Sequence, residues 1–448
     1  MMSLILQTIR TRLEGSPTAT RILSGFSWSV FSSLFAQMVG LLTLVAAARL
    51  LGADIFGRFV ILQSTFATIG LLSGFGVGIT AIRYLPTRHQ DLPERIGQIL
   101  GLCQRTVIVF GLVCSAAVYF FSNEIASGLF KSAELTLPLT IASSSVVFLA
   151  LDGLYKSALI GLERIKAYAF VSIIGQIANL SAVVCGVLAF GLIGAAIGLA
   201  ISAITQATIS RIVFSRASRA AGITIVGRDS FREWRVLRDF ALPSLLATAM
   251  VAPAHWICQV ILAGNDGNFH QIAIFGIALQ WFNALLLLPT AAGRVLTPIL
   301  VESTNLGQHD QAWKVLQIGV GAMAAVALPC ALLGLIAAPL IMRTYNPAFI
   351  DGAGALRMAI IAASIAAIIS PLGNVLIARS KVWLGLLMNL GWACMYVGTA
   401  YLLRIYGALG VTVGLACAYV IHSLWLAVWS YRSISRSKEP FARSFSQQ

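Results

Sequence analysis

Apolar residues fill most of the chain in long runs, and short polar connections separate these runs. A run of about 20 apolar residues is long enough for a helix to cross a hydrocarbon layer of about 30 Å. Backbone groups in lipid must bond internally, and apolar runs of this length do so as helices rather than as the alternating strands of a barrel. The pattern predicts about twelve transmembrane helices, near residues 23–50, 56–82, 98–121, 137–160, 168–190, 192–214, 239–263, 272–299, 315–340, 353–377, 382–403 and 408–430.

Lysines and arginines are distributed unevenly among the connections. Most lie at the two ends of the chain and after even-numbered spans, whereas the opposite connections hold chiefly Lys131, Arg343 and Arg404. By the positive-inside rule both termini are cytoplasmic, which requires an even number of spans. The charge distribution therefore supports the count of twelve.

A polar stretch near the middle of the chain divides the spans into six and six. The predicted fold is all-α, with two pseudo-symmetric six-helix lobes around a central cavity. Phe231, Trp234 and Leu237 recur at helical spacing in the polar stretch, which predicts a helix on the membrane surface. Residues 1–22 are also expected to lie on the cytoplasmic membrane surface as a helix, and a disordered tail is the alternative for them. The predicted units are a cytoplasmic interfacial segment 1–22, an N-terminal lobe 23–214, a cytoplasmic linker 215–238, a C-terminal lobe 239–430 and a basic cytoplasmic tail 431–448.

Two short motifs repeat between the halves. Residues 191–200 (GLIGAAIGLA) match residues 407–416 (GALGVTVGLA), at an offset of 216 (407 − 191). The tripeptide Ile-Phe-Gly recurs at residues 55–57 and 274–276, at an offset of 219 (274 − 55). Glycines are common in membrane helices, but two matches at nearly one offset favour a duplication. Because each half has an even number of spans, the copies run in the same direction through the membrane and substrate should bind between them.

Composition excludes a soluble domain. Hydrophobic residues make up 58% of the chain and charged residues only 10%, against roughly 25% charged residues in soluble proteins. The net charge of +15 belongs mostly to the connections, so we expect no nucleic-acid partner. The seven cysteines lie in apolar runs without metal-ligand spacing, and no phosphate loop or nucleophile elbow is present. We therefore expect no metal, no cofactor and no enzymatic activity.

Several cations lie inside or at the margins of the predicted spans. An Arg or Lys at mid-membrane costs about 2.5–3.5 kcal/mol on insertion scales, so such residues must reach the headgroups, pair or line a hydrated cavity. Arg83 and Arg294 both lie near the cytoplasmic end of the second span of a half and could form a diphosphate clamp across the lobe interface. Anchoring at the membrane surface is the alternative. The candidate substrate-binding residues are Arg83, Arg294, Arg49, Arg105 and Lys156.

Asp152 and Lys156 stand four residues apart on the fourth span, so they share a helix face and can neutralise each other. Asp152 could titrate during transport while Lys156 meets a substrate anion, or the pair could be a static lock. His255 is a second candidate for ion coupling. Pro243 and Pro253 interrupt the seventh span and predict a hinge at the lobe junction.

Uncharged polar residues also recur at helical spacing. Such stripes either line a hydrated cavity that binds sugar hydroxyls or form contacts between helices, and the sequence leaves both interpretations open. The candidate cavity residues are Gln37, Gln176, Asn179, Gln259, Gln280, Asn283 and Asn374.

Residues 48–59 (ARLLGADIFGRF), followed by Gly74-Phe75-Gly76 and Ile82-Arg83-Tyr84, carry a family resemblance. This opening resembles that of the polysaccharide-exporting flippases, the O-antigen and exopolysaccharide branch of the multidrug/oligosaccharidyl-lipid/polysaccharide exporter superfamily. The recognisable sequence covers mainly spans one to three, whereas the similar topology covers the whole chain. Peptidoglycan-precursor flippases carry two further spans, and drug-extruding relatives carry more acidic residues in the N-terminal lobe, where Asp152 is the single deep acid here.

The resemblance implies a multi-pass carrier of the bacterial inner membrane with a cationic central cavity. It would move an undecaprenyl-diphosphate-linked oligosaccharide to the periplasmic leaflet by alternating access, for surface polysaccharide biosynthesis. We expect a monomer whose partners are the lipid-linked sugar, membrane lipids and other glycan-assembly membrane proteins. A cation-coupled drug antiporter, a membrane glycosyltransferase or ligase, and a non-transporting scaffold are the alternatives.

Overall fold

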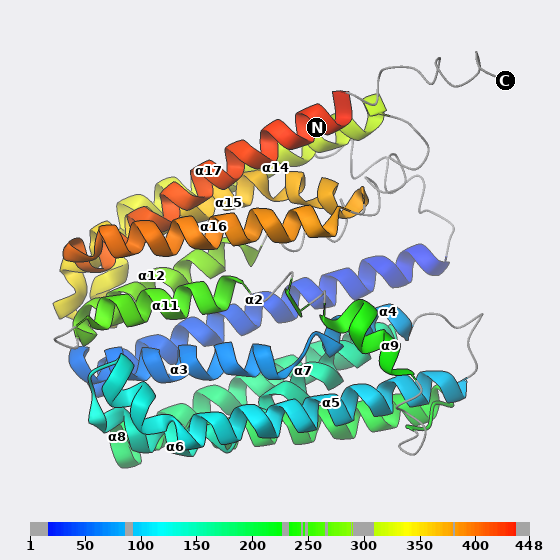
Figure 1. The fold of residues 1–448 in the computed structure, drawn as a ribbon, viewed down its shortest axis with the longest axis horizontal. Helices are drawn as coiled ribbons and strands as arrows, with labels where there is room; N and C mark the ends of the chain where they lie inside the picture. The colour runs from blue at the N-terminus through cyan, green and yellow to red at the C-terminus, as the bar shows by residue number, and fades with distance from the viewer. Residues whose placement is uncertain are drawn as a thin grey trace.

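The fold is helical throughout the described part of the chain (Figure 1). This confirms the predicted all-α fold class. The computed structural model describes residues 17–85, 93–225, 233–242, 245–246, 250–264, 268–287, 289, 309–379 and 381–435.

The first half of the chain forms one group of packed helices, which we call the N-lobe. Two predicted spans are each split into two helices, at Gly74–Gly76 and at Ser144–Ser145. The second of these breaks bends the chain by 47°. The helices are α2 (Pro17–Leu51), α3 (Ala53–Ser73), α4 (Val77–Tyr84), α5 (Pro93–Phe120), η1 (Glu124–Leu129), η2 (Ala133–Leu135), α6 (Thr136–Ser143), α7 (Val146–Gly161) and α8 (Ile165–Ala220).

The second half forms a similar group, which we call the C-lobe. The chain enters it through α9 (Trp234–Val236) and η4 (Leu237–Ala241). Its helices are α11 (Val251–Ala263), α12 (Phe269–Leu285), α14 (His309–Tyr345), η5 (Pro347–Gly352), α15 (Ala353–Ala378), α16 (Val382–Leu402), η6 (Arg404–Tyr406) and α17 (Gly407–Ser435).

The described residues contain eight helices long and apolar enough to cross a membrane, or nine when the bent pair α6 and α7 counts as one span. One of them, α8, has 56 residues and is too long for a single crossing. It breaks at Phe190 and Gly191, whose backbone angles are not helical. The count of twelve stays a prediction, because parts of the predicted seventh and eighth spans lie outside the described residues.

The glycine motif that repeats in the sequence forms the same local structure twice. Gly191 and Gly407 both have positive φ, 57° and 60°, where a helix begins after a sharp change of direction. The next glycine of each copy lies against the preceding helical segment: a Cβ on Gly194 would be 1.8 Å from the oxygen of Gly186, and one on Gly410 would be 2.0 Å from that of Leu403. Both motifs therefore need glycine for a tight helical hairpin.

The two ends of the helical bundle differ. We call the end at which α2 begins and α17 ends the terminal face, and the end at which α2 passes into α3 the opposite face (Figure 1). Near the opposite face one buried apolar cluster joins the lobes and includes Leu51, Phe56, Phe275, Phe349 and Ala408.

Toward the terminal face the described apolar residues form separate clusters. One lies within the N-lobe, around Val77, Ile99 and Leu154. Two smaller ones lie within the C-lobe, around Leu316 and Met388. Accordingly, the lobes lie close together at the opposite face and diverge toward the terminal face (Figure 1).

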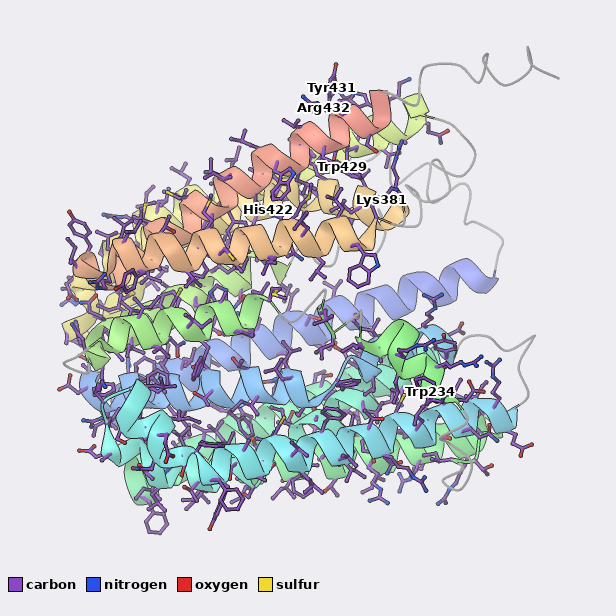
Figure 2. All side chains as sticks on the ribbon, in the orientation of Figure 1. Trp234, Lys381, His422, Trp429, Tyr431 and Arg432 are labelled. Atoms are coloured by element: carbon purple, nitrogen blue, oxygen red, sulfur yellow. The ribbon has the colours of Figure 1, made fainter. Side chains whose placement is uncertain are left out.

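Aromatic and basic side chains gather at the terminal face. Figure 2 shows Trp429, Tyr431 and Arg432 at this end of the C-lobe and Trp234 at the same end of the N-lobe. The Arg238 guanidinium lies 5.0 Å from the centre of the Trp234 ring. Such residues are typical of a membrane interface.

The predicted segments 1–22 and 215–238 are described only in part, and α8 continues six residues into the second of them, to Ala220.

Candidate functional site

A polar cavity of about 420 Å³ lies among α2, α7, α8 and α12. Three of these helices belong to the N-lobe, and α12 brings one residue from the C-lobe. The cavity starts close to the terminal face, because Tyr168 stands three residues after the start of α8 and Lys156 five residues before the end of α7. The lining residues are Ser32, Ser33, Ala36, Gln37, Gly40, Lys156, Tyr168, Ser172, Gln176 and Gln280.

The predicted charge pair forms beside this cavity. Lys156 Nζ lies 2.7 Å from Asp152 Oδ2 and donates a second hydrogen bond, of 3.2 Å, to Gln206 Oε1. The Ser210 hydroxyl donates to the other Asp152 oxygen at 2.5 Å. The Asp152 side chain is only 7% exposed, and that of Lys156 is 18% exposed. Asp152 is therefore a buried counter-ion, and Lys156 is the cation that reaches the cavity.

Amide side chains line the side of the cavity where the lobes meet. Gln37 Nε2 donates to the backbone oxygen of Gln280 at 3.3 Å, from α2 to α12. The approach is close here, because a Cβ on Gly40 would lie 3.3 Å from Gln280 Nε2. The structure therefore brings Gln37, Gln176 and Gln280 together with Lys156, as an uncharged hydrogen-bonding surface around one ammonium group.

The other predicted cavity residues lie elsewhere. Asn179 accepts from Ser202 at 3.0 Å, one turn beyond Gln176. Gln259 is buried and accepts from the Ser64 hydroxyl at 2.5 Å, which links α11 to α3. Asn283 is exposed and Asn374 is half-buried on α15, and neither lines the cavity. For Gln259 the contact between helices is the better interpretation of the sequence pattern.

Most of the predicted cationic residues do not line the cavity. Arg83 is exposed on α4 at the terminal face, and Arg105 is exposed on α5, which does not border the cavity. Arg49 lies in the last turn of α2, at the opposite face, where its Nε donates to the backbone oxygen of Thr344 at 2.8 Å. Arg294 lies outside the described residues. Among the described residues that line the cavity, Lys156 is thus the one cation, where the sequence predicted several.

Arg49 belongs instead to a set of contacts that close the opposite face. Its bond to Thr344 joins the N-lobe to the C-lobe. Nearby, the Arg58 guanidinium lies 4.8 Å from the centre of the Phe269 ring across the same interface. Phe56 and Phe349 pack with ring centres 5.9 Å apart. These contacts seal the lobes against each other on the side away from the cavity.

The second predicted coupling residue, His255, lies in the core of the C-lobe. Its Nδ1 is 3.2 Å from the Tyr396 hydroxyl. The rings of Phe275, Phe282 and Trp392 surround it, with centres 6.2–6.3 Å away. Within the described part of the chain it forms no hydrogen bond to a carboxylate and does not line the cavity. A role for His255 in ion coupling stays a prediction.

The predicted hinge is only partly described. Pro253 is the third residue of α11, within the first turn, where proline interrupts no hydrogen bond of the helix. It therefore breaks no hydrogen bond of α11 itself, and its role as a hinge of the seventh span stays a prediction. Pro243 lies outside the described residues.

Two residues beside the cavity were not among the predicted site residues. Gln206 and Ser210 complete the Asp152–Lys156 network from the second half of α8. A Cβ on Gly175 would lie 2.8 Å from Gln206 Oε1, so this glycine leaves space for the amide. The signal was present, because Ser202, Gln206 and Ser210 recur every four residues on one helix face.

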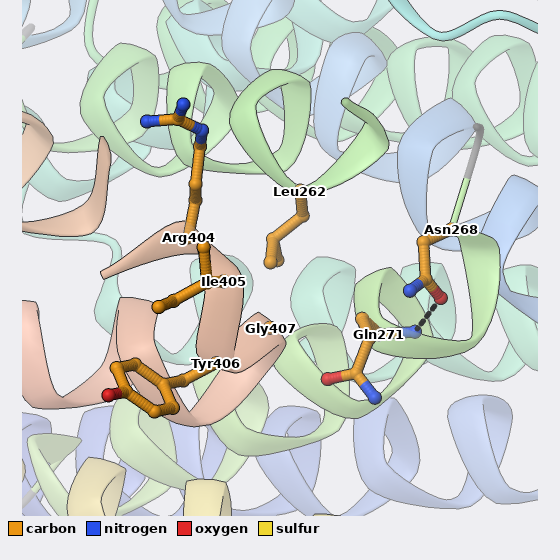
Figure 3. Close-up of a pocket in the computed structure, with 7 residues that line it drawn as sticks. All are labelled: Leu262, Asn268, Gln271, Arg404, Ile405, Tyr406 and Gly407. Atoms are coloured by element: carbon orange, nitrogen blue, oxygen red, sulfur yellow. Dashed lines mark hydrogen bonds between the residues drawn. The ribbon is translucent and has the colours of Figure 1, made fainter. Parts of the chain in front are cut away.

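A second pocket, of about 310 Å³, lies at the opposite face of the C-lobe and includes none of the predicted site residues (Figure 3). Most of its polar groups form hydrogen bonds with other residues of the C-lobe. Gln271 accepts from the backbone nitrogen of Ala408 at 2.8 Å, and Arg404 donates to the oxygen of Tyr401 at 3.0 Å. We therefore take the larger cavity as the functional site. Within the described residues, no group of His, Cys, Asp and Glu side chains could hold a metal ion.

Comparisons with known proteins place the chain in one family. A family model described as polysaccharide biosynthesis protein matches residues 22–304. The EPS I polysaccharide export inner membrane protein EpsE of Ralstonia nicotianae (strain ATCC BAA-1114 / GMI1000) is 29% identical over 399 residues, which cover 87% of this chain and 89% of that protein. The protein of the same name from Ralstonia solanacearum is 28% identical over 374 residues, 81% of this chain and 83% of the relative.

Solved structures share the fold at low sequence identity. A multidrug resistance MATE family transporter of the MOP superfamily, in an inward-facing conformation, superimposes with a TM-score of 0.76 over 91% of this chain and 96% of that chain, at 14% identity. An outward-facing conformation of such a transporter gives 0.68, over 96% of this chain and 99% of that one, also at 14% identity. This chain therefore has the MATE-like fold of MOP superfamily transporters.

Proposed function

Because the chain belongs to the family of polysaccharide biosynthesis proteins, we propose that it is a polysaccharide transporter of the bacterial inner membrane and that it flips an undecaprenyl-diphosphate-linked oligosaccharide between the leaflets. The names of the relatives and the transporter fold favour transport over an enzymatic reaction. We further infer that the terminal face is cytoplasmic, because basic residues such as Arg83, Arg164 and Arg432 are exposed there.

One observation carries the proposal: a polar cavity lies near the terminal face of a bundle whose opposite face is sealed by contacts between the lobes. A saccharide cannot cross the lipid unaided, because each hydroxyl moved into hydrocarbon without a partner costs several kcal/mol. The serines and glutamines of the cavity replace the lost water contacts. The lipid tail stays in the bilayer throughout.

Alternating access follows from the distribution of contacts. In the described conformation the lobes share a core at the opposite face and diverge at the terminal face, so cargo can enter from the proposed cytoplasmic side. Breaking the contacts of Arg49 and Arg58 while closing the terminal face would expose the same cavity to the periplasm. A ligand can drive this change only as far as it binds the two arrangements with different affinity.

The test is a flipping assay in reconstituted vesicles that contain lipid-linked oligosaccharide isolated from the producing cells. Membrane-impermeant periodate oxidises only glycan on the outer leaflet. Vesicles with the protein should become fully oxidised, whereas protein-free vesicles should stop at the outer-leaflet fraction. Gln176→Leu should slow flipping by about tenfold, since it leaves buried sugar hydroxyls unpaired. Leu188→Ala, on the exposed surface of α8, is the matched control. Equal oxidation with and without protein would contradict the proposal.

A further inference from the structure

We propose that the cavity recognises the neutral sugar part of the cargo, and that the diphosphate stays outside it at the terminal face. In this view the Asp152–Lys156 pair acts as one hydrogen-bonding group without net charge rather than as a phosphate clamp. The inference rests on the proposed function and specifies which part of the substrate this site binds.

The charge of the cavity supports a site that binds the sugar and leaves the diphosphate outside. Lys156 is the one cation among the described lining residues, and Asp152 neutralises it at 2.7 Å. A diphosphate carries at least two negative charges and needs several cations or arginine forks when it leaves water. A phosphate placed on Lys156 would also approach the buried Asp152 carboxylate, which repels it. The network therefore disfavours a multivalent anion.

The Lys156 ammonium still has a donor to offer. It has three N–H groups, and the structure uses two of them, on Asp152 and Gln206. The third is available to one acceptor in the cavity. Because the net charge of the pair is zero, a sugar hydroxyl oxygen suits this donor better than a phosphate oxygen does. Gln206 and Ser210 are positioning residues here, since they fix the pair without lining the cavity.

The rest of the lining suits a pyranose ring. Ser172 and Gln176 have no hydrogen-bond partner in the described part of the chain, so their groups are free to donate and accept. Ser32 and Ser33 donate to the backbone oxygen of Ser29 and keep oxygen lone pairs for a ligand. Tyr168 adds an aromatic ring, on which the apolar face of a sugar can stack. Hydroxyls that both donate and accept match this set.

The volume of the cavity and its distance from the terminal face also support binding of the sugar inside and of the diphosphate outside. A volume of about 420 Å³ lies at the lower end of the range of small-molecule sites, so it holds a short saccharide rather than a polymer. The cavity begins about one helical turn from the start of α8. A diphosphate attached to the lipid would then remain at headgroup level, where Arg83, Arg164 and Lys166 are exposed.

The test uses the full-length protein in lipid nanodiscs and lipid-linked oligosaccharide isolated from the producing cells. Two competitors are compared: the free glycan, released from its diphosphate by mild acid, and undecaprenyl diphosphate without sugar. We expect the free glycan to compete at least tenfold more strongly than the sugar-free lipid. Stronger competition by the sugar-free lipid would overturn the inference. If the lipid-linked glycan itself does not bind, the proposed function fails instead.

Substitutions of the charge pair give an independent answer. Lys156→Gln leaves the Asp152 charge buried without a counter-ion, and glycan binding should fall more than tenfold. Adding Asp152→Asn removes that charge and should restore binding to within about threefold of the natural protein. If Lys156 clamps phosphate, the double variant stays as weak as the single one, because the cation is still missing. Gln176→Leu should weaken competition by the free glycan at least tenfold, and unchanged competition would also count against the inference.

Discussion

Gly57 holds the two lobes in contact at the opposite face, and its replacement by alanine should open that face. Gly57 lies in the first turns of α3 and packs against the start of α12. A Cβ at this position would lie 2.0 Å from the backbone oxygen of Phe269. An ordinary contact begins at 3.4 Å, so the two backbones would have to separate by roughly 1.4 Å. The backbone fixes the position of the added Cβ, and its two nearest neighbours are the backbone oxygen and carbon of Phe269, so no side-chain rotation can relieve the overlap.

The magnitude follows from the packing. Inserting a methyl group into a well-packed interface costs about 1–3 kcal/mol. This cost falls on the arrangement in which α3 and α12 touch and is absent where they are apart. A difference of about 1.4 kcal/mol changes an equilibrium tenfold, so the population with an open opposite face should rise roughly 5- to 150-fold. Separation also weakens the Arg58–Phe269 contact of 4.8 Å.

Spin labels at positions 54 and 268, which are both exposed at the opposite face, measure this opening by pulsed electron resonance. The seven native cysteines are replaced first. We expect Gly57→Ala to add a longer-distance population. Gly321→Ala, where nothing lies within 4 Å of the added Cβ, is the matched control and should leave the distances unchanged. A folded Gly57→Ala protein with the distances of the natural protein would refute the reasoning.

Three further predictions concern single contacts. Arg49→Gln removes the 2.8 Å bond to Thr344 and should shift the same distance distribution toward opening by at most about tenfold, because the side chain is exposed; no shift would show that this bond does not hold the lobes. Gly191→Ala places a side chain on a backbone with φ 57° and ψ −130°, and this strain should lower the free energy of unfolding by about 1–3 kcal/mol. The Tm in detergent should therefore be lower than that of Gly153→Ala, whose added Cβ has no atom within 4 Å. Equal Tm values would contradict the prediction. Glu134→Gln removes the ion pair with Arg58, and because Glu134 is 68% exposed the loss should stay below about 1 kcal/mol, so a large drop in Tm would be unexpected.

The spans were predictable because an apolar run must be long enough to cross the hydrocarbon layer. Predicted spans near 98–121 and 353–377 correspond to α5 (Pro93–Phe120) and α15 (Ala353–Ala378) within a few residues. The breaks within the predicted second and fourth spans were not visible in this pattern, since hydropathy reports environment and not the direction of a helix. The glycines of Gly74–Gly76 favour a turn, but the apolar composition of this run gave no sign that the helix breaks there.

The site was predictable where side-chain polarity and helical spacing coincide. Gln37 and Gln176 were found because each continues a polar stripe on an apolar helix, and both line the cavity. The arginines were harder to place, since charge shows that a residue needs water or a partner but not which one it finds. Arg49 illustrates this, because its position at the end of α2 puts it among the contacts between lobes.

The most direct test of the account asks whether glycan occupies the cavity. Ser172→Cys, in the background without native cysteines, places a thiol on the cavity wall. We predict that a membrane-impermeant maleimide labels this thiol from the cytoplasmic side and that lipid-linked oligosaccharide slows the labelling at least tenfold. Ala220→Cys, exposed at the terminal-face end of α8 and outside the cavity, should be labelled from the same side but show no such protection. Labelling of Ser172→Cys that stays equally fast with saturating glycan would contradict the central claim.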